Sequence, residues 1–380
     1  MTPDRATRSA SPDDFVAPKA AHPEHEQAWR ELMDVSSEPN VFAGPEMIGA
    51  AAGSVAPDDW QIAVAGSGDR FEAVAPFRTM RAVPLIGPPV IETFWSDFGP
   101  VGTPLLRNAS PALVGRLIDV LGRCGSVVRM RYQRLDGPFV AALTAATEQR
   151  GIALEVTDVH ERAQLVSSTD PEEALGPALK SKRRKELARL HRRLGDHGPV
   201  SHAVATAPSD VTAALEDYIR IEHAGWKGEG GSSFAAEETR RRFARAFVSA
   251  RAAAGAVRID TLSVAEKPIA SLITHRTGDT AYLWKIAYDE AFAAYSPGVQ
   301  IVRLATEDFL ADPTLQNVDS LATADHPMIN RLWAGRLRMG TLIFATTASA
   351  NRQAARVTAI HDAHVRLRAA ARSLRDRIRR

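Results

Sequence analysis

Hydrophobic and polar positions along the first part of the chain follow two periods. Short apolar or alternating runs bounded by turn residues are typical of strands, and apolar positions three and four apart are typical of helices. We expect strands at 60–66, 71–79, 82–87, 126–132 and 152–158. We expect helices at 24–55 (two helices), 110–122 and 138–150. Strands that alternate with helices predict an α/β or α+β fold.

The same order of elements returns in the second part of the chain. We expect strands at 200–207, 256–264, 268–276, 280–288, 317–324 and 339–347. We expect helices at 209–224, 235–253, 296–311 and 328–333, with a loop at 226–233. Two helices also begin alike at equivalent places, with Ser110-Pro111-Ala112 in one part and Ser296-Pro297-Gly298 in the other. The repeat predicts a tandem duplication whose site is kept mainly in the second copy.

The repeat divides the chain into five parts. We expect a disordered N-terminus at 1–20, a first half at 21–168, a basic linker helix at 169–198, a second half at 199–348 and a basic amphipathic helix at 349–380. The linker helix is either a connection with a solvated face or a basic wall beside an anionic ligand. The last helix has apolar positions three and four apart: Val357, Ile360, His364, Leu367, Ala371, Leu374 and Ile378. That stripe favours docking on the body or on a partner helix over binding to an anionic membrane surface.

Bulk composition narrows the classes of function. The 380 residues are 45% hydrophobic and 24% charged, as in ordinary globular proteins, and the net charge of +2 predicts no DNA or other polyanion partner. The single Cys124 excludes an intramolecular disulfide and a cysteine metal cluster, and it fits a cytoplasmic location. No apolar run approaches the length of a transmembrane helix, and the first 20 residues lack the apolar region of a signal peptide.

The helix start at Ser296 has the chemistry of an anion site. The first turn of a helix leaves backbone N–H groups free and carries positive partial charge. Pro297 loses no bond at the first helical position, and Gly298 has no side chain to keep a phosphate from the backbone. The strand at 280–288 points its end at the same place. An ordinary capped helix is the alternative interpretation.

Several stretches together resemble a known superfamily. They are SKRRKELARLHRRL (181–194), EHAGWKGEGGSSF (222–234), KPIASLITHRTGDTAYLWKIAYDEAFAAYSPG (267–298), EPNVFAGPEM (38–47) and SDFGPVGTPLL (96–106). With the order of elements, they resemble the GNAT N-acyltransferases over about 25–347, and more narrowly the CelD-type acetyltransferases of cellulose and exopolysaccharide production, relatives of the FemAB group. The resemblance implies tandem GNAT-like halves, each a mixed, mainly antiparallel sheet flanked by helices.

The resemblance also implies acyl transfer from acetyl-CoA or another acyl-CoA to an amine. Pantetheine would follow the strand at 280–288, and the pyrophosphate would rest on the helix start. The implied cofactor-binding residues are Ile286, Ala294, Tyr295, Ser296, Gly298 and Val299. The usual GNAT loop is Arg/Gln-x-x-Gly-x-Gly/Ala, and only Gly298 matches it in kind. The FemAB relatives use aminoacyl-tRNA in place of acyl-CoA. Aminoacyl-tRNA is therefore an alternative donor, and the basic linker helix would suit it.

Four side chains are candidates for proton transfer in such a reaction. Glu222 and Asp289 are candidate bases, with a surface carboxylate and a turn former as the alternatives. Lys285, inside an apolar strand, is expected to be half-buried and to bind an anion or have a lowered pKa, or to extend to water. Tyr288 is a candidate acid for the leaving thiolate, or a core residue.

Three further residues are expected on the acceptor side, namely Trp226, Lys227 and His326. The acceptor implied by the resemblance is an amino sugar, a glycan precursor or another amine. The alternative from a different class is a non-catalytic scaffold that kept the fold in polysaccharide production. We expect no metal, because the sequence holds no cluster with metal-ligand spacing.

Overall fold

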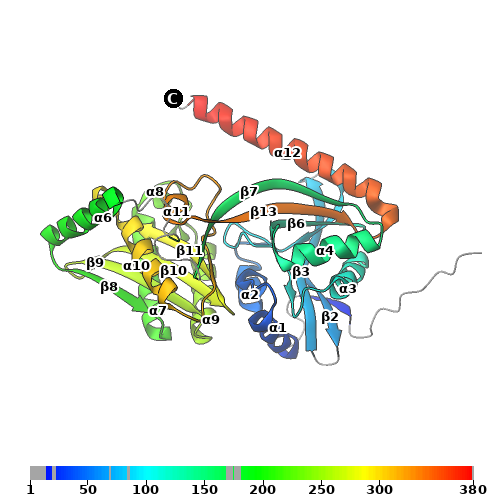
Figure 1. Cartoon of the computed structure of the whole chain (residues 1–380), viewed down its shortest axis with the longest axis horizontal. Coiled ribbons are helices and arrows are strands. Elements are labelled where there is room, and N and C mark those ends of the chain that lie inside the picture. Colours follow the sequence, from blue (N-terminus) through cyan, green and yellow to red (C-terminus); the bar gives the residue numbers. More distant parts are fainter. Residues whose placement is uncertain are drawn as a thin grey trace, which may run out of the picture.

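The computed structural model describes residues 14–18, 23–67, 70–83, 86–167, 174 and 181–378. The strands in these ranges form one 13-stranded sheet with helices packed on it (Figure 1). The mixed α+β fold expected from the alternation of periods is therefore confirmed.

The bounds of the elements are as follows. The strands are β1 Phe15–Pro18, β2 Gln61–Ser67, β3 Arg70–Val83, β4 Ile86–Thr93, β5 Leu105–Leu106, β6 Val127–Arg134, β7 Leu154–Val166, β8 Val200–Ala205, β9 Val257–Val264, β10 Lys267–Thr277, β11 Thr280–Tyr288, β12 Asn317–Asp319 and β13 Gly335–Ala345. The α-helices are α1 Pro23–Val35, α2 Pro45–Ala51, α3 Pro111–Gly122, α4 Pro138–Gln149, α6 Ser181–Leu194, α7 Pro208–Ala224, α8 Trp226–Glu229, α9 Glu238–Ala253, α10 Pro297–Ala311, α11 Ile329–Leu332 and α12 Asn351–Ile378. The 3₁₀ turns are η1 Val41–Ala43, η3 Gly195–His197, η4 Phe234–Ala236, η5 Glu290–Tyr295 and η6 Ala348–Ala350.

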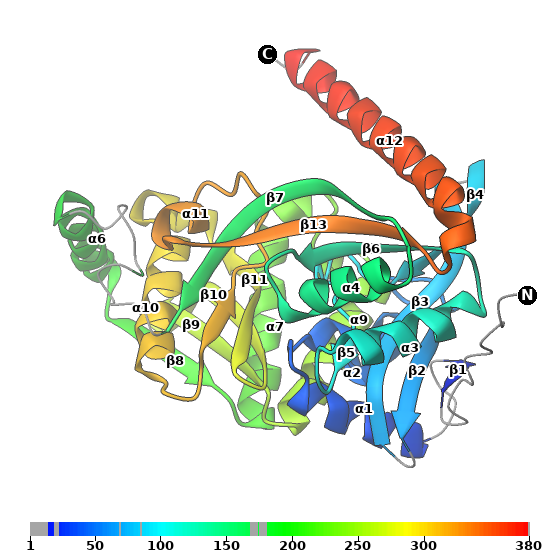
Figure 2. The same ribbon diagram turned by 45° about the vertical axis from the view of Figure 1, so that its right-hand side comes forward.

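Two strands join the halves. The sheet order is β1-β2-β3-β4-β6-β13-β7-β12-β11-β10-β9-β8, with β5 paired to β3. We call β1–β6 with α1–α4 the first half and β8–β12 with α6–α11 the second half. β13 follows the second half in sequence but lies between β6 and β7, and β7 pairs with β12. Figure 2 shows β7 and β13 arching side by side from one half to the other. The predicted bounds of the second half, 199–348, stay a prediction; β13, the last strand of that range, lies between β6 and β7 in the shared sheet.

The halves also share one hydrophobic core. It takes Trp29 and Phe42 from the first half and Phe247, Tyr282 and Trp284 from the second. The ring of Phe42 lies edge-on to Tyr282 at 5.3 Å between centroids. Separate cores lie under α3 and α4 in the first half and under α10 in the second. Burial of aromatic rings from both sides fixes the position of β11 relative to the first half.

Several strands differ from the sequence expectation. β3 continues through 70–83 and β4 follows at 86–93, where the pattern indicated one short strand at 82–87. Pro88 and Pro89 hid β4, because proline is read as a turn residue. β4 tolerates them because β6 pairs with it only from Ile91 onward, so on that side no strand requires a backbone N–H donor at positions 88 and 89.

Three further elements, β7, β12 and α8, also differ from the sequence expectation. β7 runs to Val166 rather than to 158, because its polar residues find buried partners, such as Arg162 on Asp319. β12 ends at Asp319 rather than at 324, since Leu321 has φ of 51° and turns the chain out of the sheet. The expected loop at 226–233 begins with the short helix α8.

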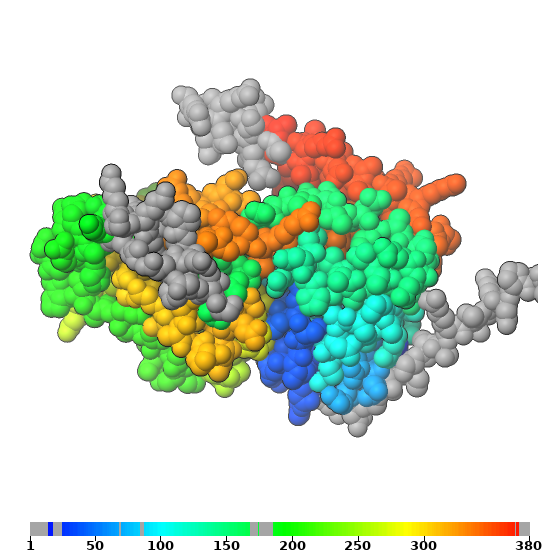
Figure 3. Space-filling model, viewed as in Figure 1, coloured from blue at the N-terminus to red at the C-terminus, as the bar shows by residue number. Residues whose placement is uncertain are grey.

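The two ends of the described chain pack on the first half. Residues 15–18, inside the segment 1–20 that was expected to be disordered, form β1 on β2; residues 1–13, 19 and 20 of that segment lie outside the described residues. Val357 of α12 is buried, and His361 Nε2 lies 2.6 Å from Asp158 Oδ2. Leu367, on the predicted stripe, is 70% exposed. The first turns of α12 therefore dock on the first half, as the orange and red surface in Figure 3 shows.

Candidate functional site

A gap opens between two parallel strands of the second half. β11 and β12 pair only from Thr280–Asn317 to Tyr282–Asp319, and β12 then ends. Asp289 N–H donates to Ile269 O of β10 (2.7 Å). Because successive residues of a strand face opposite sides, Ile286 and Tyr288 direct their backbone groups towards the side that β12 has left. The end of β11 thus has an open edge that can bind an extended chain by backbone hydrogen bonds.

The helix α10 begins beside this edge with an unusual N-cap. Ser296 has φ of 53° and ψ of 49°, in the left-handed region, because it also ends η5 by donating its N–H to Ala293 O (3.0 Å). Within the described chain, its side chain makes no cap hydrogen bond to α10. Val299 and Gln300 donate their N–H groups to Ser296 O. The buried Gly298 backbone faces the cavity, and a Cβ there would lie 3.2 Å from Tyr288 Cδ1.

A cavity of about 530 Å³, which we call the β11 cleft, joins the open edge to this helix start. Its walls are the end of α7, α8, the end of β11, η5, the start of α10 and the loop 326–328. The predicted site residues that line it are Glu222, Trp226, Lys227, Ile286, Tyr288, Ser296, Gly298, Val299 and His326. The structure thus brings together residues that are up to 104 positions apart between Glu222 and His326.

A buried ion pair closes one end of the β11 cleft. Glu222, only 5% exposed, accepts hydrogen bonds from Tyr218 Oη (2.9 Å), Phe234 N–H (2.8 Å) and Lys227 Nζ (3.0 Å). Lys227 Nζ also lies 3.3 Å from Ile286 O on the open edge. Glu222 therefore holds the Lys227 ammonium in place, close to the open edge of β11.

Lys285 lies on the other side of this ion pair. It lines a second cavity of about 480 Å³, the Lys285 cavity, together with Asp97, Phe98, Arg240 and the same Glu222 and Lys227. Its Nζ lies 4.8 Å from the ring centroid of Phe98. Within the described residues, no hydrogen bond or ion pair to this ammonium is recorded. Burial, with Lys227 nearby, lowers the pKa of Lys285 to about 8.

Three predicted site residues lie outside both cavities. The carboxylate of Asp289 accepts from Lys267 Nζ (2.7 Å) and Ala291 N–H (3.0 Å), which is the turn-forming alternative. Tyr295 Oη contacts His197 Nε2 at 2.7 Å, so its ring belongs to the outer side of η5. Ala294 lies in the same turn, η5. Of residues 294–299, which were expected to hold a cofactor, only 296–299 line the β11 cleft.

His326 forms the wall opposite Trp226. Its Nδ1 lies 3.4 Å from the N–H groups of Met328 and Ile329, and burial lowers the pKa of its imidazole. A neutral ring that accepts at Nδ1 carries its proton on Nε2. His326 can thus offer a hydrogen-bond donor to a bound group.

Other residues of the site were not found from the sequence. Tyr218 precedes Glu222 by one helical turn, a spacing that signals a shared face. Asp97 and Phe98 come from the first half, and no local pattern links them to Lys285. His191 of the basic helix α6 contacts Gln300 Oε1 at 2.6 Å, and the Arg193 guanidinium lies 5.6 Å from the Tyr295 ring. The basic helix thus flanks the start of α10.

Comparison with known proteins agrees with this geometry. Residues 181–326 match the family model described as an acetyltransferase (GNAT) domain. Similar solved structures include a conserved protein of unknown function from Bacteroides thetaiotaomicron (TM-score 0.55, 12% identity, covering 84% of this chain and 96% of that one). FemX is similar over 84% of this chain and 95% of its own, with TM-score 0.55 and 8% identity. The C-terminal domain of a putative lysylphosphatidylglycerol synthetase from Agrobacterium fabrum has TM-score 0.53 and 12% identity, over 90% of this chain and 97% of that one.

These findings describe similarity in fold and in one domain. The fold is similar to that of FemX, and residues 181–326 carry the match to a GNAT acetyltransferase domain. No curated protein matches the chain by sequence. In the described part of the chain, no group of His, Cys, Asp or Glu residues has the arrangement of a metal site. Likewise, no described helix has the length and apolar character needed to cross a membrane.

Proposed function

We propose that the chain is an N-acyltransferase that moves an acyl group from an acyl-CoA thioester to a primary amine. The observation that carries the proposal is the open edge of β11 ending at the start of α10, where Gly298 lines the cleft. The N–H groups of Val299 and Gln300 already donate to Ser296 O, so a pyrophosphate would bind there through the Gly298 backbone and the positive end of the helix. The match of residues 181–326 to a GNAT acetyltransferase domain supports the same donor.

The donor fits the β11 cleft by its chemistry. Gly298 lets the helix start pack closely against the Tyr288 ring, where a Cβ would be crowded, and α6 brings His191 and Arg193 close to the helix start. The amide groups of pantetheine would pair with the backbone of Ile286 and Tyr288, as a strand would. The thioester would then lie near Lys227 and the Tyr288 hydroxyl.

The acceptor amine would enter through the Lys285 cavity, which meets the β11 cleft at Glu222 and Lys227. Lys285 is our candidate base, because its lowered pKa gives it a neutral fraction near physiological pH. Glu222 already accepts three hydrogen bonds, so we assign it to holding Lys227. The Asp289 carboxylate stabilises the turn at the start of η5, so we assign it no catalytic role.

The reaction follows from these assignments. The amine nitrogen attacks the thioester carbonyl carbon, and a backbone N–H of the open edge stabilises the oxyanion. The proton lost by the amine goes to Lys285 Nζ. Collapse of the intermediate breaks the C–S bond, and the leaving thiolate takes a proton from Tyr288 Oη.

We assign the acceptor to polar amines such as amino sugars or glycan precursors. The Lys285 cavity carries charges of both signs, with Asp97 and Glu237 near Arg240 and Lys285. Such a lining suits a hydroxyl-rich acceptor better than an apolar one. The resemblance of the sequence to CelD-type acetyltransferases points to the same class.

Calorimetric titration with acetyl-CoA tests the donor. Gly298→Trp fills the start of α10, and we expect it to weaken acetyl-CoA binding by about 100-fold or more (~2.7 kcal/mol). Ala112→Trp, at the same position of α3, is the matched control and is expected to bind as the wild type does. Failure of the wild type to bind acetyl-CoA or longer acyl-CoA would reject this donor and favour an aminoacyl-tRNA, whose binding would weaken steeply with salt.

A further inference from the structure

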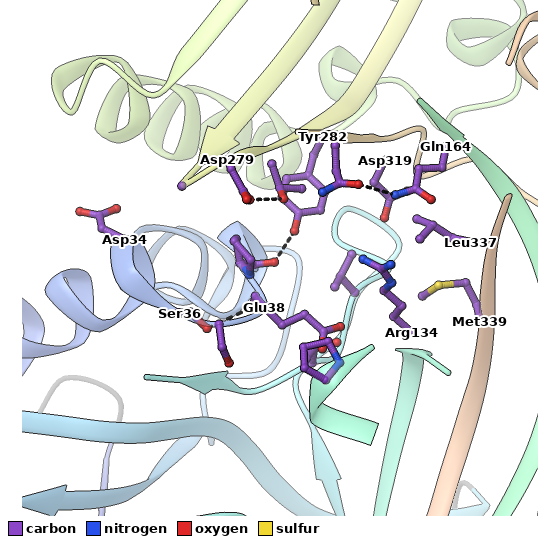
Figure 4. Close-up of a pocket in the computed structure, with 18 of the residues that line it drawn as sticks. Asp34, Ser36, Glu38, Arg134, Gln164, Asp279, Tyr282, Asp319, Leu337 and Met339 are labelled. Atoms are coloured by element: carbon purple, nitrogen blue, oxygen red, sulfur yellow. Dashed lines mark hydrogen bonds between the residues drawn. The ribbon is translucent and has the colours of Figure 1, made fainter. Parts of the chain in front are cut away.

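A third cavity, of about 400 Å³, lies between the two halves. We call it the interhalf cavity. Its walls come from the loop after α1, the ends of β6 and β7, the start of β11, β12 and the start of β13. Figure 4 shows the side chains that face one another across it: Ser36, Glu38 and Arg134 on one side and Gln164, Asp279, Tyr282 and Asp319 on the other. Both halves therefore contribute polar groups to one enclosed space.

Glu38 is a buried carboxyl group with an unused oxygen. The residue is only 9% exposed, and its Oε2 accepts from Phe139 N–H (3.2 Å) at the start of α4. Within the described chain, no hydrogen bond or ion pair to Oε1 is recorded, and the side chain lines the cavity. Burial raises the pKa of Glu38 to about 7, against the opposing effect of Arg134 and with a smaller contribution from Asp136. The carboxyl group thus keeps one oxygen that can accept a hydrogen bond from a ligand in the cavity.

Arg162 adds a positive charge to the wall of the cavity. The side chain is almost fully buried, donates to Pro100 O (2.8 Å) and pairs with Asp319. Four carboxylates line the cavity against two guanidinium groups, Arg134 and Arg162. Above pH 7, where Glu38 is ionised, four negative and two positive charges leave an excess of two negative charges. The cavity therefore attracts a cation.

We propose that the interhalf cavity binds a small hydroxylated amine through its ammonium group, as a second ligand site distinct from the β11 cleft. The ammonium donates to Glu38 Oε1 and to the Asp279 carboxylate at the rim. Hydroxyl groups of the ligand pair with Gln164 and with Arg134, which line the cavity. The volume suits a ligand of monosaccharide size.

The site is too far from the acyl-transfer region to present an acceptor there. Tyr282 lines the interhalf cavity and Tyr288 lines the β11 cleft, six residues further along β11. At a rise of about 3.3 Å per residue, the two positions are roughly 20 Å apart. Thr280 and Tyr282 pair with Asn317 and Asp319, which are the last contacts before β12 leaves β11. An amine bound in the interhalf cavity contacts the residues where β11 and β12 are still paired. It therefore acts as an effector that stabilises the place where the gap between these two strands begins.

Calorimetric titration with D-glucamine (1-amino-1-deoxysorbitol) tests the site. Sorbitol is the matched neutral ligand, since it has a hydroxyl in place of the amine. We expect one glucamine to bind per chain and sorbitol not to bind. Glu38→Gln keeps an acceptor for Phe139 N–H but loses the charge, and should weaken glucamine binding by about tenfold or more. Glucamine binding to the wild type should also weaken as the pH falls from 8 to 6, because Glu38 takes up a proton.

Three further variants make the result decisive. Asp279→Asn should weaken glucamine binding, and it decides the question if Glu38→Gln does not fold. Asp119→Asn, a surface carboxylate paired with Arg150, should have no effect. Gly298→Trp should bind glucamine normally, whether or not it binds acetyl-CoA, so failure of the proposed donor is distinguishable. Equal binding of sorbitol, no binding at millimolar glucamine, or wild-type affinity in both Glu38→Gln and Asp279→Asn would overturn the proposal.

Discussion

The two halves of the molecule begin equivalent helices with the same Ser-Pro pair but with different N-caps. Ser110 is extended, with φ of −103°, and its Oγ accepts from Leu113 N–H (3.3 Å). Ser296 is left-handed, and within the described residues it makes no such bond. Ser110 caps α3 with its side chain, whereas Ser296 accepts from Val299 and Gln300 through its backbone O alone and leaves the Gly298 backbone towards a cavity. The difference arises from the preceding turn, since η5 must end at Ser296.

The strands beside α3 and α10 also differ, because a buried charge on β4 has hydrogen-bond partners in the first half and, within the described residues, one on β11 has none in the second. In the first half, β4 and β6 pair, and Glu92 is buried with Arg129 while it also accepts from Arg131 Nε (2.6 Å) and Trp95 Nε1 (2.7 Å). In the second half, Lys285 is half-buried and unpaired within the described chain. The first half thus pairs its buried carboxylate with arginines, and the second half keeps a lysine with a lowered pKa. In the proposed function, the first half serves stability and the second half serves the chemistry.

The largest expected effect concerns the closed half. Glu92→Leu leaves Arg129 buried without its carboxylate, where burial already lowers the pKa of that guanidinium. We expect the free energy of unfolding to fall by about 3–5 kcal/mol, measured by urea denaturation. Asp119→Asn, which breaks an exposed pair, should cost less than about 1 kcal/mol. Acetyl-CoA affinity should remain unchanged in folded Glu92→Leu; a loss of affinity would show that the closed half takes part in binding.

A second prediction concerns Lys285 in the open half. If Lys285 is the base, it must be neutral, so the transfer rate of the wild type should rise with pH through about 8. Lys285→Met should lower the rate at pH 8 by roughly 100-fold and flatten that rise. Lys267→Met, an exposed lysine paired with Asp289, is the control. An unchanged pH profile in Lys285→Met would remove Lys285 from the mechanism.

Much of the fold was predictable because periodicity is a local property. The alternation of elements and the repeated order gave the α+β class and the two helix starts at Ser110 and Ser296. The neighbours of β13 were not predictable, since strand exchange depends on contacts with β6 and β7 about 170 to 210 residues earlier in the sequence. The polar pattern of β7 likewise concealed a strand, because its charged residues have partners far away in sequence.

The candidate site also has one part that local sequence could predict and one part that it could not. Tyr288, Ser296 and Gly298 were placed together correctly, because a strand, a turn and a helix follow one another directly in the chain. The surroundings of Lys285 were not foreseen, since Phe98 comes from the other half. Lys285 and Tyr288 were both candidates for proton transfer, and alternation along β11 sends their side chains to different cavities. The catalytic roles of these residues stay predictions.

The smallest expected effect tests the opening comparison most directly. Ser110→Ala removes a cap hydrogen bond and should lower the free energy of unfolding by about 1 kcal/mol. Ser296→Ala removes no cap bond and keeps the same left-handed strain, so the change should stay within about 0.5 kcal/mol. Urea midpoints compared at equal slope give both values. Equal losses would mean that Ser296 also caps α10 in solution, and the helix start would then resemble its closed counterpart and lose the feature that favours a bound anion.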